Sequence, residues 1–86
     1  MSAFGDQLAA LTAKESAAAM GDNERLGEMV ERLASALGFT IAIACRGDGA
    51  VIDEMMAGAE AHAHAEAVER APLIRLLSLA AAKGQP

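Results

Sequence analysis

Apolar residues recur at helical spacing along most of the chain, most clearly over residues 24–46. There an i, i+3, i+4, i+7 stripe is typical of one face of an amphipathic helix. Its first members are Leu26, Met29, Val30, Leu33 and Leu37. Asp22 or Asn23 can accept a hydrogen bond from a free amide of the first turn and so cap this segment. The pattern predicts one long helix from about Glu24 to about Arg46.

The stretch Phe39–Cys45 also carries a pattern typical of a strand. Its large residues alternate with small ones, and Ile, Thr and Phe favour strands. A strand needs a partner, however, and no second strand-like run is present in the chain. Ile41 and Ala44 also continue the helical stripe. We therefore predict helix here, with the alternative of a short strand at 39–45 that pairs across a dimer in an α+β fold.

Helices are predicted on both sides of this segment. Before it, Phe4, Leu8 and Leu11 form only a thin apolar stripe, which predicts a weak helix over residues 2–20. After it, the run from Arg46 to Gly49 predicts a tight turn. In that turn, Gly47 suits the left-handed C′ position that ends a helix, and Asp48 suits the next N-cap.

The C-terminal half is predicted to form two helices. The first runs from about Gly49 to Arg70, and Ala71-Pro72 is expected to end it because proline starts helices more readily than it continues them. The last helix then runs to Lys83 and is apolar over most of its circumference. Every charged residue between Gly47 and Glu69 is acidic, whereas those beyond Glu69 are basic. These two helices are therefore complementary in charge, within one subunit or between subunits.

The predicted fold is an all-α single small domain over residues 1–86. A long antiparallel helical hairpin, about residues 22–70, is flanked by the weak N-terminal helix and the apolar C-terminal helix. A chain this short buries a limited share of its surface, and small chains commonly gain further burial by oligomerisation. We expect a helical bundle that is completed in a homodimer or higher oligomer.

Composition and charge exclude several classes of protein. The chain has 22 alanines, no Trp, no Tyr, one Cys and a net charge of −5. Its apolar content is too high for a disordered chain, and a single Cys cannot form a disulfide within the chain. An acidic chain without stacking aromatics is not expected to bind nucleic acid. The N-terminal residues lack the pattern of a secretory signal, and no uncharged stretch is long enough to span a bilayer, so we expect a cytoplasmic protein without membrane contact.

Candidate metal chemistry is confined to one short segment of the predicted third helix. Glu60 and His64 lie one turn apart there, as do His62 and Glu66, and a carboxylate–imidazole pair at this spacing can share a divalent ion. The two histidines are about 200° apart around the helix axis, so a site would need ligands from a second helix or a second subunit. Otherwise we expect no cofactor.

Catalytic chemistry has little support in the sequence. Cys45 is expected near the C-terminal end of a helix, where the dipole disfavours a thiolate, so we interpret it as a small buried apolar residue. No serine lies in a nucleophile elbow or in a Ser-x-x-Lys motif. The prediction therefore leans away from an enzyme.

A ridge of small residues at i, i+4, i+8 would allow another helix to approach closely; it is formed by Ala34, Gly38 and Ala42. The second half of this helix has no evident water-facing side, which indicates an interface. The predicted interface residues are Leu33, Ala34, Leu37, Gly38, Ile41, Ala42, Leu73, Leu76 and Leu77.

The sequence favours a small, cytoplasmic, non-catalytic module for protein–protein interaction or regulation, acting through its helix faces. Homo-oligomerisation is expected, and the acidic third helix suits a protein partner with a basic surface. The alternative is an oligomeric helical bundle that binds a metal ion or small ligand through Glu and His of the third helix.

Overall fold

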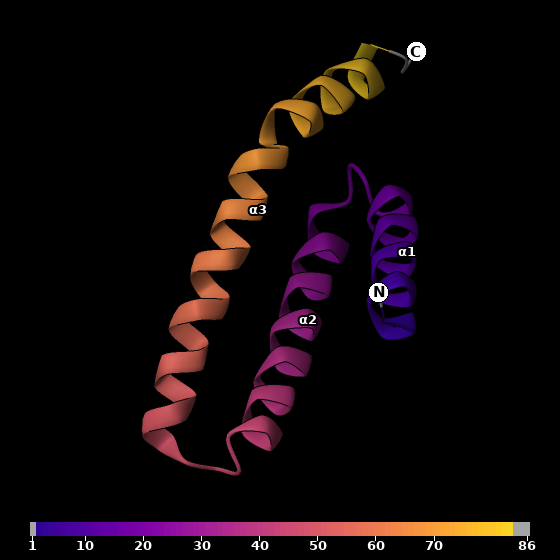
Figure 1. The fold of residues 1–86 in the computed structure, drawn as a ribbon. Helices are drawn as coiled ribbons and strands as arrows, with labels where there is room; N and C mark the ends of the chain where they lie inside the picture. The colour runs from indigo at the N-terminus through magenta and orange to yellow at the C-terminus, as the bar shows by residue number, and fades with distance from the viewer. Residues whose placement is uncertain (1, 84–86) are drawn as a thin grey trace. The chain divides into compact units, whose positions relative to one another are not determined.

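The computed structural model describes residues 2–83 of the chain, which form three α-helices and contain no strand (Figure 1). Helix α1 spans Ala3–Ala18, α2 spans Asn23–Ala44 and α3 spans Gly49–Lys83. The all-α class predicted from the sequence is confirmed for this part of the chain.

The chain divides into two compact units, Met1–Ser35 and Ala36–Pro86. The first unit holds α1 and the beginning of α2. The second holds the end of α2, the turn after it and α3. The sequence prediction of a single domain stays a prediction.

The break between α1 and α2 is formed by Gly21 and the capping residue Asp22. Gly21 has a φ of 91°, a left-handed conformation that glycine adopts without steric penalty. Asp22 then caps α2, because the backbone N–H of Arg25 donates to Asp22 Oδ1 at 3.0 Å. Ser2 caps α1 in the same way through the N–H of Gly5. Both starts are therefore set by local side-chain hydrogen bonds.

Residues 39–44 are helical, so the alternative of a strand at 39–45 is wrong. The Thr40 hydroxyl donates to the carbonyl of Ala36 at 2.8 Å, a bond to the preceding turn that a helix permits. Ile41 is only 3% exposed and is the one buried residue of α2. The helical stripe, and not the alternation of large and small residues, therefore determines the structure of this segment.

The end of α2 differs by one residue from the prediction. The N–H of Gly47 donates to the carbonyl of Ala42, and that of Arg46 donates to Ile43, which together form a Schellman motif. Arg46, with a φ of 52°, therefore occupies the left-handed C′ position predicted for Gly47. Gly47 follows at C″, also with a positive φ of 75°.

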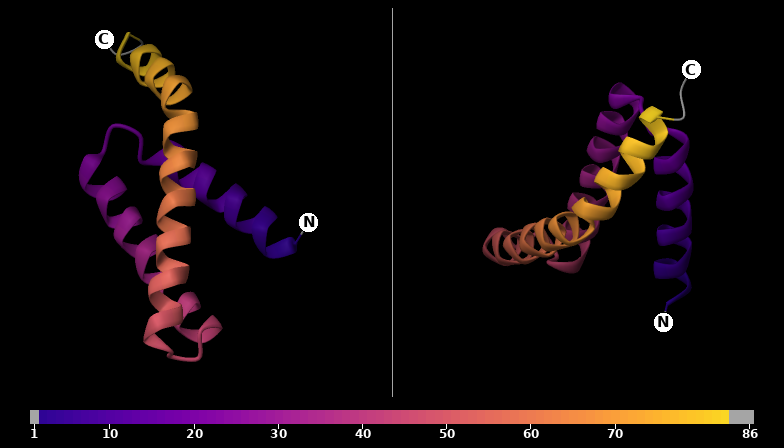
Figure 2. Two further views of the ribbon diagram at one scale, coloured as in Figure 1. Left: turned by 60° about the vertical axis from the view of Figure 1, so that its left-hand side comes forward. Right: turned by 90° about the horizontal axis from the view of Figure 1, so that it is seen from above.

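Helix α3 begins as predicted but does not end where predicted. Asp48 caps it by accepting from the N–H of Ala50 at 3.0 Å. The helix then continues through Pro72, so the predicted break at Ala71-Pro72 is wrong. Proline removes one helical hydrogen bond and crowds the carbonyl four residues earlier, which bends a helix when the flanking residues are strong helix formers. Figure 2 shows that the axis of α3 changes direction in its last part.

Candidate functional site

The four candidate metal ligands all lie exposed on α3. Glu66 accepts a hydrogen bond from Arg70 Nε at 3.1 Å, so its carboxylate is engaged one turn along the same helix. Within residues 2–83, no group of three or more His, Cys, Asp or Glu side chains is arranged to hold a metal ion. The other three candidates are Glu60, His62 and His64, and the prediction that a metal site on this segment takes further ligands from a second helix or a second subunit stays a prediction.

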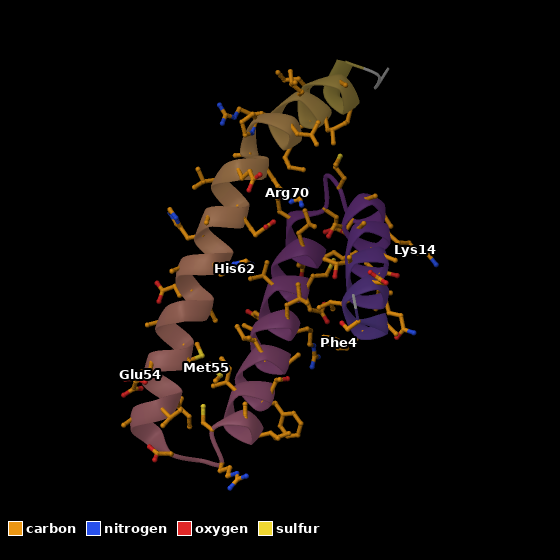
Figure 3. All side chains as sticks on the ribbon, viewed as in Figure 1. Phe4, Lys14, Glu54, Met55, His62 and Arg70 are labelled. Atoms are coloured by element: carbon orange, nitrogen blue, oxygen red, sulfur yellow. The ribbon has the colours of Figure 1, made fainter. Side chains whose placement is uncertain are left out.

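Cys45 is buried, in agreement with its interpretation as a small apolar residue. Its Sγ lies 3.9 Å from Met55 Sδ, and Figure 3 shows Met55 on the first turns of α3. This pair joins the end of α2 to the start of α3 inside the second unit, where Ile41 is also buried. Its burial beside a methionine side chain supports a packing role, and among the described residues Cys45 belongs to no group of three or more side chains that could hold a metal ion.

Most of the predicted interface residues are exposed. Among the large ones, Leu76 leaves 65% of its surface exposed and Leu73 leaves 55%. The ridge is also uncovered, because a Cβ added at Gly38 would meet no atom within 4 Å. Ile41 differs from the rest, since only 3% of its surface is exposed. The other exposed or half-exposed members are Leu33, Ala34, Leu37, Ala42 and Leu77.

A groove between α1 and α2 was not predicted from the sequence. It lies inside the first unit and has a volume of about 370 Å³, within the range of roughly 300–1,000 Å³ common for binding sites. Its apolar lining comes from both helices. The lining residues are Leu8, Leu11, Thr12, Glu15, Arg25, Glu28, Met29, Arg32 and Leu33.

Two ion pairs lie at the groove: one connects its two helices, and the other lies along α2. Arg25 Nη2 of α2 lies 3.2 Å from Glu15 Oε2 of α1. Glu28 and Arg32 form the second pair, within α2, at 4.0 Å. The groove therefore combines an apolar surface with charged groups of both signs.

The sequence contained a signal for this groove. Leu8 and Leu11 are spaced to share one face of α1, and Met29 and Leu33 share one face of α2. Because the break between the helices is short, these two faces can meet. Only the ion pair Glu15–Arg25, which joins residues in different helices, could not be expected from spacing.

No helix in the part of the chain that the structure describes has both the length and the apolar character needed to cross a bilayer. A scan against models of protein families, a search of curated proteins and a search of solved structures each found no match to this chain.

Proposed function

We propose that the chain is a small, cytoplasmic, non-catalytic module that acts through protein–protein interaction and associates with itself. The observation that carries this proposal is the exposure of its apolar side chains. Over residues 2–81, 18 large apolar residues are at least 40% exposed, whereas only Ala19, Ile41 and Cys45 are buried. Apolar faces that are left exposed typically mark interaction sites.

Self-association explains this exposure better than a small-molecule site does. Exposed leucines occur on all three helices and in both units of the chain, whereas a small ligand occupies a single site. Helices with apolar stripes commonly bury them against other helices in a bundle. Covering these stripes by a second copy would complete the predicted antiparallel bundle. The single unpaired cysteine is consistent with a reducing compartment.

The acidic surface of α3 supports a second kind of protein contact. All charged residues between Gly47 and Glu69 are acidic, and no basic side chain interrupts them. A field of one sign attracts a partner of the opposite sign and suppresses association between like surfaces. We propose that a protein with a basic surface binds here.

A two-chain metal site is the second candidate. Glu60 and His64 are both exposed and lie one turn apart on α3, so they could bind a divalent ion together with the same residues of a second copy. This candidate also requires self-association.

The proposal is tested by measuring the mass of the native protein over a range of concentrations, using light scattering coupled to gel filtration. A dimer or larger oligomer that dissociates on dilution supports it. A monomer at all concentrations up to about the millimolar range, where even weak association has a free energy of about −4 kcal/mol, would contradict it.

A further inference from the structure

The second unit of the chain has few buried side chains. Within residues 36–81 only Ile41 and Cys45 are buried. The sulfur of Cys45 lies 3.9 Å from that of Met55, so this contact joins the end of α2 to the first turns of α3 (Figure 3). A thioether packs readily against other apolar groups in such a position. Because so little else is buried in this unit, loss of the Cys45–Met55 contact is expected to weaken the α2–α3 hairpin.

The two sulfur atoms of this contact differ in their access to solvent. Cys45 is only 6% exposed, whereas Met55 leaves 41% of its surface exposed. Oxidation of a cysteine requires an accessible thiolate. Oxidation of a methionine requires only that the oxidant reach the sulfur, since a thioether has no proton to lose. An oxidant in solution is therefore expected to react with Met55 and to leave Cys45 reduced.

We propose that Met55 is an oxidation-sensitive contact, and that its conversion to methionine sulfoxide separates the start of α3 from the end of α2. The oxidant is a peroxide such as hydrogen peroxide. A lone pair of Met55 Sδ attacks one peroxide oxygen, the O–O bond breaks and an S–O bond forms. The second oxygen leaves as water, with the proton that the transferred oxygen loses. The sulfur is oxidised by one electron pair, which the peroxide takes up. This proposal does not depend on self-association.

The added oxygen is incompatible with the contact for two reasons. It makes the end of an apolar side chain polar, and a polar group held against buried residues such as Ile41 and Cys45 loses its hydration. The two sulfur atoms are also already at contact distance, so an oxygen between them would push the helices apart. If the oxygen turns to solvent instead, the side chain leaves the contact.

The test is peroxide treatment of the full-length protein, with Tm followed by circular dichroism and each sulfoxide located by mass spectrometry of peptides. Oxidation at Met55 is expected to lower Tm by at least about 4 °C, a shift typical of a lost contact in a domain of this size. Met55→Leu conserves volume and should keep nearly the same initial Tm, but it should lose this oxidative drop. Methionine sulfoxide reductase supplied with a dithiol should restore the Tm of the oxidised protein.

Two other methionines provide matched controls. Met56 is 41% exposed and is the next residue along α3, about 100° around the helix axis from Met55. Met20 is 43% exposed and lies in the break between α1 and α2. Met56→Leu and Met20→Leu should both retain the drop in Tm on oxidation.

Three results would overturn the proposal. The first is complete oxidation of Met55 without a change in Tm. The second is a drop that persists in Met55→Leu or that disappears in Met56→Leu or Met20→Leu. The third is a drop that follows oxidation of Cys45, detected as loss of the free thiol on alkylation after unfolding. None of these results bears on the proposed self-association, which is measured by mass.

Discussion

Arg25 and Glu15 join α2 to α1 through a hydrogen bond of 3.2 Å between the guanidinium Nη2 and the carboxylate Oε2. Both side chains are partly exposed and border the groove. The pair therefore connects the two helices that form the walls of the groove.

A double-mutant cycle with Glu15→Gln and Arg25→Gln measures the strength of this connection. We expect a coupling energy of about 0.2–1 kcal/mol in urea unfolding, because exposed ion pairs contribute little. Raising the salt concentration should reduce it. The pair Glu66–Arg70, which lies within one helix, is the control. Zero coupling at low salt would show that Arg25 does not hold α1.

In the turn after α2, substitutions at two neighbouring residues are expected to change the free energy of unfolding in opposite directions. Arg46→Gly is expected to raise the free energy of unfolding by about 0.5–1 kcal/mol, since glycine has no Cβ clash in the left-handed region. Gly47→Ala is expected to lower it by about 1 kcal/mol for the same reason. Gly49→Ala, at a helical position without positive φ, should not destabilise. A loss of stability in Arg46→Gly would argue against the Schellman geometry.

Gly38 and Gly27 provide a matched test of the small-residue ridge. Both lie inside α2, and a Cβ on either meets nothing within 4 Å, so each change to alanine should stabilise the isolated chain by about 1 kcal/mol. Only Gly38 belongs to the ridge. We therefore expect Gly38→Ala to weaken self-association by about tenfold and Gly27→Ala to leave it unchanged. Identical association in the two variants would remove the ridge from the interface.

Removal of metal ions distinguishes the two candidate functions. For the interaction module we expect no change in Tm when EDTA is added. A bound divalent ion would instead stabilise the native state by mass action, and chelation would lower Tm. The double variant His62→Ala, His64→Ala is the control, because it should abolish any such drop. A drop in Tm that this variant lacks would favour the two-chain metal site.

Local signals in the sequence predicted most of the helix boundaries. Asp22 and Asp48 cap the helices they were expected to cap, because capping depends on residues only a turn apart. The outcome at Pro72 could not be predicted in this way. Whether a proline breaks a helix or only bends it depends on the helix formers on both sides, here an alanine-rich and a leucine-rich stretch.

The α1–α2 groove could not be predicted from the sequence, because it depends on how the two helices pack against each other. The stripes on α1 and α2 were visible as patterns, but their contact depends on the turn at Gly21 and on the pair Glu15–Arg25. Arg46 in a left-handed conformation was likewise unexpected, since the sequence offered Gly47 for that position. Contacts between helices determine whether the two stripes meet, and the geometry of the turn determines which residue takes the left-handed conformation. Neither follows from the preferences of single residues.

A native mass spectrum of the untagged protein, purified without chelator, measures self-association directly. The exposed apolar faces predict a mass equal to a whole number of chains greater than one, with no additional mass. A bare monomer that persists as the protein concentration is raised would contradict self-association, because it would show that the chain keeps these faces uncovered by a second copy.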